Sequence, residues 1–299
     1  MQNKIILTTD SGMCPNMEHN PIIIPDQITS SNGKTYRDNK IDITTEDILN
    51  DKENTYKTAA PLLEDYKNTF INLLEKGYDI IHLSLGSGIS SSSVNNAHLI
   101  ANELNEKYKN KIYVIDSLTG SIGGTCYYEA AYQKLVKSNL PAKKLKEELE
   151  ILKSNIKTCF YVPDATGFIK SGRDNSKKHS FSKGVLSLSS KVLSMTTFKY
   201  RVDFYENGDL FLKKIFRSSK TNGMINMTKE IINSNNMENY DNAFCAIGTL
   251  HEKDISMNVL YEYLSSLGYF KEIIKEEIGN VVAPYGCNDL CGISLVRKK

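Results

Sequence analysis

The sequence predicts an α/β protein, with a doubly wound N-terminal domain built on a parallel sheet and a second, α+β domain. Three apolar strands in the first half, at 4–9, 78–85 and 111–115, each end in small polar residues. Each is followed by polar turns and by helical apolar spacing, which is typical of a sheet with helices on both faces. The second half instead shows a β-hairpin pattern around the turn residues 206–209, which favours antiparallel pairing.

The composition fits two folded domains and argues against several classes of partner. A chain of 299 residues has room for two domains of about 150 residues each, and we place them at 1–156 and 157–299. Because 37 basic and 35 acidic residues are finely mixed, we expect no nucleic-acid partner. No apolar run approaches the ~20 residues needed to span a bilayer.

The amino terminus and the cysteines indicate where the protein is located and whether it binds a metal. Nothing at the start of the sequence resembles a signal peptide, so we expect a cytoplasmic protein. In that compartment the six scattered cysteines are interpreted as reduced thiols. Cys287 and Cys291 have no second Cys or His pair nearby, so we expect no metal site, and no motif calls for a cofactor.

Turn residues and apolar spacing divide the first half into elements. Ile22–Ile24 precedes Pro25 and is predicted as an edge strand, because proline is tolerated mainly at sheet margins. Asn32-Gly33 predicts a hairpin turn, and Pro61 suits the first turn of a helix. Helices are expected to begin at residues 62 and 94, and two further helices are expected at 126–136 and 142–156.

The second half alternates strands and helices less regularly. The hairpin strands are expected at 197–205 and 210–216. The other strands are expected at 158–162, 243–247, 280–284 and 292–296, and the helices at 221–232 and 255–267.

The segment Gly86–Ser93 is the first candidate for a binding site. It follows the central strand and contains two glycines and five serines, and we expect it to form a loop before a helix that starts near Val94. Glycine lets the backbone approach a ligand, serine hydroxyls donate hydrogen bonds, and the N–H groups of a first helical turn attract anions. Such residues are also common as a helix cap with a flexible connection, so both interpretations stay open.

Five polar segments occur in the order and at about the spacing found in the DegV family. They are Thr9-Asp10-Ser11, Thr58-Ala59-Ala60-Pro61, Ser87-Gly88-Ile89-Ser90-Ser91-Ser92, Asp116-Ser117 and Ser171-Gly172-Arg173. Over essentially its whole length the chain resembles this family, and in particular the fatty-acid-binding subunit of bacterial fatty acid kinase.

The resemblance implies a long-chain fatty acid in an apolar tunnel between the two domains. In the family a threonine of a T-S-x-P motif and a serine of an S-x-L-S-G-T loop hold the carboxylate. By position these are Thr58 and Ser90, with Ser87, Gly88 and Ser91 beside the latter. A partner kinase phosphorylates the bound carboxylate, so the resemblance implies a binding protein with no catalytic residue of its own; the sequence has no P-loop.

Two residues are further candidates on the same resemblance. Tyr285 stands where the family has a histidine a little before G-P-G, and the G-P-G itself is absent. A tyrosine can donate a hydrogen bond to a carboxylate, although a buried core tyrosine is the alternative interpretation. Arg173 follows a glycine and is expected near the phosphate or the partner kinase, unless it is an ordinary solvated charge.

Two other classes of function stay open. The Gly/Ser segment could serve a serine hydrolase or a small transferase, but a hydrolase needs a base, and the five histidines lie in no recognisable motif. His82, within the central strand, is interpreted as a core residue. The chain could also bind some other small amphiphilic anion.

Overall fold

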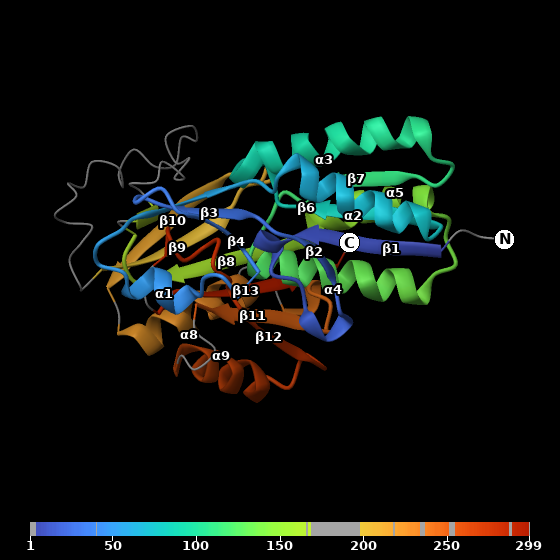
Figure 1. The fold of residues 1–299 in the computed structure, drawn as a ribbon. Coiled ribbons are helices and arrows are strands. Elements are labelled where there is room, and N and C mark those ends of the chain that lie inside the picture. The colour runs from blue at the N-terminus through green and yellow to red at the C-terminus, as the bar shows by residue number, and fades with distance from the viewer. Residues whose placement is uncertain are drawn as a thin grey trace.

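The computed structural model describes residues 4–39, 41–165, 167–168, 198–217, 219–233, 237–250, 255–286 and 289–298. The first part of the chain forms a parallel sheet (Figure 1). Its strand order is β2-β1-β6-β7, with β1 at Lys4–Asp10, β2 at Ile22–Ile24, β6 at Tyr78–Ser84 and β7 at Ile112–Asp116.

Helices cover both faces of this sheet, as adjacent residues of β6 show. Ile80 packs with α2 (Leu63–Glu75) and α3 (Ser87–Lys107). Its neighbour Ile81 packs with α4 (Ile122–Lys137) and α5 (Ala142–Leu152), and successive side chains of a strand point to opposite faces. The doubly wound prediction is therefore confirmed.

The second sheet is mixed and has the strand order β10-β9-β8-β13-β11-β12. Only β11 and β12 pair in parallel; the other neighbours are antiparallel. Its strands are β8 Ile156–Val162, β9 Phe198–Phe204, β10 Leu210–Arg217, β11 Cys245–Thr249, β12 Ile273–Glu277 and β13 Cys291–Val296. This is the α+β architecture expected for the second half; the division of the chain at residue 156 stays a prediction.

Helix α4 lies between the two sheets (Figure 1). It contributes Tyr127 and Tyr128 to the core beneath the parallel sheet, and Ile122 and Cys126 to the core beneath the mixed one. The opposite face of the mixed sheet is covered by α8 (Lys220–Asn233) and α9 (Ile255–Ser266). Short 3₁₀ turns occur at Ser11–Met13, Met17–His19, Lys153–Asn155 and Met237–Asn239.

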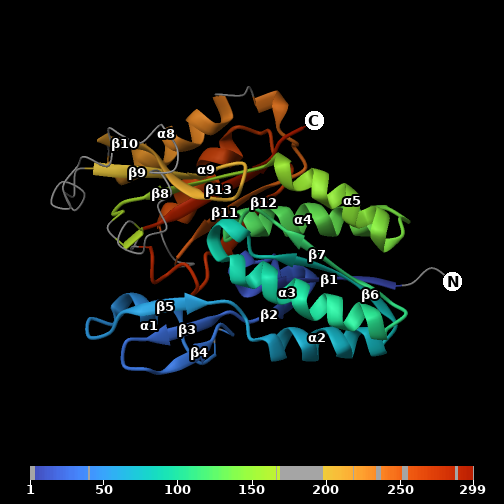
Figure 2. The ribbon, with the colours of Figure 1, turned by 90° about the horizontal axis from the view of Figure 1, so that it is seen from above.

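A segment that we call the flap, residues 27–59, extends from the first half of the chain to the second sheet. It contains a small antiparallel sheet of β3 (Gln27–Ser30), β4 (Thr35–Arg37) and β5 (Tyr56–Ala59), and the helix α1 (Thr45–Asn50). Three flap isoleucines, at 28, 43 and 48, are buried in the same cluster as Phe160 and Leu290 of the second domain. Figure 2 shows the flap facing the mixed sheet, with the loop that follows β12 between them.

Two elements differ from the sequence prediction. The expected strand at 280–284 is a run of turns, in which Gly279 O accepts from Val282 N at 3.1 Å and Val282 O accepts from Tyr285 N at 2.9 Å. The strand lies just before it, at Ile273–Glu277. This strand is at the edge of the sheet and ends in Lys-Glu-Glu, so its sequence lacks the apolar pattern of a core strand.

In the part of the chain that the structure describes, no helix is long and apolar enough to cross a membrane.

Candidate ligand-binding site

An apolar cavity of about 80 Å³ lies between the two sheets. The first domain contributes Leu85 and Ile89 to its wall, and the second contributes side chains such as Phe160, Val202 and Val282. Ser121 and Tyr285 supply the polar side-chain atoms of its described lining. Such a cavity favours an apolar ligand with few hydrogen-bonding groups.

Tyr285 and Thr58, both predicted site residues, meet at the edge of this cavity. The Thr58 N–H donates to Tyr285 Oη at 3.1 Å, and the two hydroxyl oxygens are 2.8 Å apart. A hydroxyl group can both donate and accept hydrogen bonds. Because Tyr285 also lines the cavity, this pair of hydroxyls lies beside the space that a ligand would occupy.

The serine segment is not the loop that the sequence predicted. Helix α3 begins at Ser87 and is interrupted at Ser90, whose φ and ψ are −144° and 89°. Ser90 Oγ accepts from Ser93 N at 3.4 Å and from Ser93 Oγ at 2.8 Å, which is the arrangement of an N-cap serine. The long part of α3 therefore starts at Ser90, and the serines form its first turn because short hydroxyl side chains satisfy helix ends.

The remaining candidates of this segment have different surroundings. Ile89 lines the cavity, whereas its neighbour Ser90 is not among the lining residues. The Ser87 N–H donates to Asp116 Oδ1 at 2.9 Å, and the Ser91 side chain is exposed. A side chain at Gly88 would lie 2.2 Å from the backbone of Gly208, so this glycine allows the β9–β10 turn to pack against α3. Their contribution to binding stays a prediction, and Arg173 lies outside the described residues.

A buried polar network holds the end of β6 from which α3 starts. Asp10 is fully buried and accepts from Leu85 N at 2.7 Å, from Ser84 Oγ at 2.9 Å and from the Tyr66 hydroxyl at 2.7 Å. His82 Nε2 lies 3.2 Å from Asp10 Oδ1. Burial by itself would raise the pKa of Asp10, but the His82 charge and these hydrogen bonds outweigh it and keep that pKa below its ordinary value.

His82 is a core residue, as interpreted from the sequence. It is fully buried, and its Nδ1 lies 3.0 Å from Thr8 Oγ1. His19 is paired with Glu129 at 2.6 Å. These two histidines are thus engaged with partners other than the candidate serines.

Asn280, which the sequence analysis missed, ties the flap to the turns that carry Tyr285. Its amide nitrogen donates to Asp38 Oδ1 at 3.0 Å and to Ile43 O at 2.9 Å, and its oxygen accepts from Thr45 Oγ1 at 2.8 Å. It is 1% exposed, so all three bonds are shielded from water. No local pattern could have revealed it, because its partners are more than 200 positions away in the chain.

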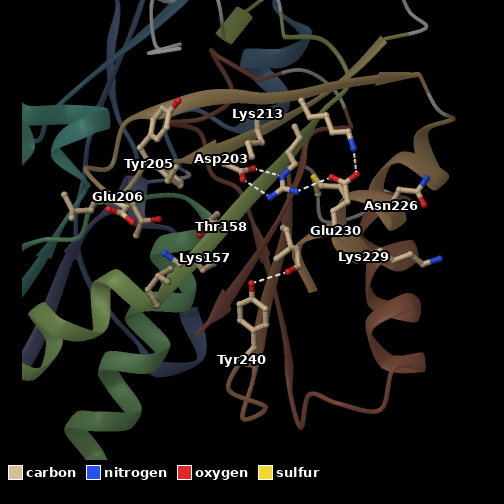
Figure 3. Close-up of a pocket in the computed structure, with 18 of the residues that line it drawn as sticks. Lys157, Thr158, Asp203, Tyr205, Glu206, Lys213, Asn226, Lys229, Glu230 and Tyr240 are labelled. Atoms are coloured by element: carbon tan, nitrogen blue, oxygen red, sulfur yellow. Dashed lines mark hydrogen bonds and ion pairs between the residues drawn. The ribbon is translucent and has the colours of Figure 1, made fainter. Parts of the chain in front are cut away.

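A larger groove of about 1380 Å³ opens on the second domain beside α8 (Figure 3). Seven basic and three acidic side chains line its described part. Arg201 donates to both oxygens of Asp203 at 2.7 Å, and Glu230 accepts from Arg201 and Lys214. These pairs involve two of the seven basic side chains. We take the smaller cavity as the ligand site because its apolar lining suits a ligand with few hydrogen-bonding groups.

Comparisons with known proteins agree with this architecture. A family model for uncharacterised proteins of the DegV family matches residues 4–298. A DegV domain-containing protein of Staphylococcus aureus is 29% identical over 181 residues, which is 58% of this chain and 62% of that relative. The chain thus aligns with about three-fifths of the length of this relative.

Three solved structures have the same fold over nearly the whole chain. A stearic-acid-binding protein of Eubacterium ventriosum has a TM-score of 0.80 at 20% identity and covers 98% of each chain. A fatty-acid-binding DegV protein of Thermus thermophilus has a TM-score of 0.79 at 20% identity, with 99% of this chain and 100% of that chain covered. The fatty acid kinase B3 protein of Streptococcus pneumoniae, loaded with linoleic acid, has a TM-score of 0.78 at 16% identity and the same coverage.

These identities are low, so the solved structures support the fold rather than any particular ligand. The family model covers almost all of the chain, and the two-sheet architecture agrees with it. This chain belongs to the DegV family.

Proposed function

We propose that this protein binds a long-chain fatty acid in the cavity between its two domains. The carboxylate would accept hydrogen bonds from Thr58, Tyr285 and Ser90, and the acyl chain would lie among the apolar side chains. The observation that carries the proposal is the Thr58–Tyr285 hydroxyl pair at the edge of an apolar cavity. Fatty acids bound by relatives of the same fold support it.

The energetics of the cavity suit such a ligand. Each methylene removed from water contributes about 0.8 kcal/mol, so the chain supplies most of the affinity. Hydrogen bonds to an ionised carboxylate are stronger than neutral ones, so a few hydroxyls suffice to hold the headgroup. A cavity of about 80 Å³ holds on the order of six water-sized groups. A longer chain therefore extends the cavity by displacing side chains of its lining.

The proposal includes presentation of the bound fatty acid to a fatty acid kinase in the cytoplasm, with this chain as the non-catalytic subunit. The support is the likeness to the kinase B3 protein of Streptococcus pneumoniae. In this role the site needs to hold the carboxylate at the cavity's edge, where the Thr58–Tyr285 pair lies, rather than deep inside.

Native mass spectrometry of protein purified from a bacterial host tests the proposal. We expect a co-purified long-chain fatty acid on the wild-type protein, and its loss or marked depletion in the Thr58→Val, Ser90→Ala double variant. Ser92→Ala, which removes an exposed hydroxyl of the same helical turn, is the matched control and should keep the ligand. A ligand-free wild-type mass that does not change when oleate or stearate is added would rule the proposal out.

A further inference from the structure

Ser121 is a polar side chain that the binding proposal does not use. It precedes α4 as its N-cap and is 5% exposed. No atom of the described residues makes a hydrogen bond with its Oγ, and it makes no cap bond to its own helix. Its backbone N–H donates to Gly12 O at 2.7 Å, so the backbone is anchored while the hydroxyl is not.

The backbone of Ser121 also has an unusual conformation. Its φ of 54° and ψ of −134° fall in a region that favours glycine, and side-chain-bearing residues are strained there. Glycine occurs next to it and twice within the first turn of α4, at positions 120, 123 and 124. The backbone of Ser121 is therefore strained, and its buried hydroxyl lacks a hydrogen-bond partner. A polar group of a ligand can supply that partner.

Ser121 belongs to the lining of the apolar cavity. Leu85, Ile89 and Phe160 belong to the same lining. A bound water would need two to four polar partners, and the described lining offers the hydroxyls of Ser121 and Tyr285, of which Tyr285 already pairs with Thr58. A carboxylate would need several donors to be buried here, whereas one hydroxyl matches one neutral oxygen.

We propose that Ser121 forms a subsite for an oxygen carried by the acyl chain, so that the preferred ligands are hydroxy- or oxo-substituted long-chain fatty acids. This inference rests on the proposed fatty-acid binding and adds a chemical class to it. The Ser121 hydroxyl donates to that oxygen, or accepts from it when the substituent is a hydroxyl.

Competition binding with stearate and a panel of positional hydroxystearates and oxostearates tests the subsite. For at least one position of the substituent, the wild-type protein should bind the substituted acid about tenfold more tightly than stearate. In Ser121→Ala that preference should disappear, with weaker binding of the substituted acid and unchanged or tighter binding of stearate. Thr119→Val is the matched control, because Thr119 Oγ1 is also buried without a partner but borders the charged groove rather than the cavity.

The possible outcomes separate this inference from the proposed function. If the wild-type protein binds no fatty acid at all, the proposed function itself fails. If it binds stearate as well as or better than every substituted acid, the oxygen subsite is wrong although the carrier function stands. If Ser121→Ala weakens all fatty acids equally, Ser121 holds the carboxylate, and the inference is again overturned.

Discussion

At the scale of single residues, the site depends on hydroxyl groups whose partners lie far away in sequence. Thr58 and Tyr285 are separated by 227 positions, yet their oxygens are 2.8 Å apart. The sequence identified both residues through family motifs, but it could not show that they bond to each other. The sequence did not single out Ser121, because a serine before a helix is usually a helix cap. Whether its hydroxyl is buried without a partner depends on the fold.

Replacing Tyr285 by Phe tests the headgroup contact. The variant keeps the ring in the cavity wall and removes the hydroxyl that contacts Thr58, so fatty-acid affinity should fall about tenfold, the cost of one charge-assisted bond. Affinity for the corresponding fatty alcohol should change less, because that headgroup is uncharged. Fluorescence displacement measures both. Tyr269→Phe, which removes a hydroxyl bonded to Tyr240 O, is the control; equal losses for acid and alcohol would contradict the contact.

The buried carboxyl of Asp26 gives a pH-dependent prediction. Burial raises its pKa well above the ordinary value, and the nearby charge of Asp10 adds to the effect. Its folded-state pKa then exceeds its unfolded one, so the folded protein holds the proton longer and loses stability as pH rises from about 4 toward the folded pKa. Asp26→Asn should remove this loss while keeping an oxygen to accept from Gly12 N.

Denaturant unfolding at several pH values checks this. The gain in unfolding free energy of Asp26→Asn over wild type should be larger at pH 8 than at pH 5. Asp47→Asn serves as the control, because hydrogen bonds from Thr44 lower the pKa of exposed Asp47 and its effect should be constant over this range. A gain for Asp26→Asn that does not depend on pH would show that Asp26 is ionised throughout.

At the scale of elements, strands with apolar runs, the β9–β10 hairpin and the Asn32-Gly33 turn between β3 and β4 were predictable, whereas the rest of the flap was not. Its strands β3 and β5 are short and half-exposed, so apolar periodicity is weak there. What holds the flap in place is tertiary: three buried isoleucines and the hydrogen bonds of Asn280. The start of α3 was misjudged because serines favour both loops and helix caps.

Removing the Asn280 side-chain amide should loosen the flap. Asn280→Ala leaves the Asp38 carboxylate and Ile43 carbonyl without this donor, at a cost of about 1–3 kcal/mol per unsatisfied buried group. Hydrogen exchange at the amides of β5 should accelerate, and fatty-acid affinity should fall because Thr58 lies on that strand. The control is Asn226→Ala on the exposed face of α8. Unchanged exchange in β5 would show that apolar packing alone holds the flap.

Gly88 permits the contact between α3 and the β9–β10 turn. A Cβ there would lie 2.2 Å from Gly208 backbone atoms, which cannot move aside as a side-chain tip would. Gly88→Ala should therefore lower the unfolding free energy by about 1–3 kcal/mol, the usual cost of overpacking. Gly279→Ala, whose Cβ would meet only Cys14 Sγ at 3.7 Å, is the control in thermal unfolding. Equal stability of the two variants would mean that the hairpin shifts freely.

At the scale of the whole molecule, the alternation of strands and helices predicted the doubly wound domain, and the hairpin predicted the second one. The cavity between them was expected only from the family resemblance, because its lining, such as Phe160 and Val202, has the sequence pattern of an ordinary core. Family resemblance also supplied the expected ligand and the replacement of a histidine by Tyr285. The structure adds that the Tyr285 hydroxyl bonds directly to Thr58 of the flap.

A crystal structure of the protein loaded with a long-chain fatty acid would show where the headgroup and the acyl chain lie. We expect the carboxylate within hydrogen-bond distance of the Thr58 and Tyr285 hydroxyls, with the acyl chain passing Val202 and Val282 between the two sheets. Density for the carboxylate away from both hydroxyls, or an acyl chain outside the space between the domains, would contradict this expectation.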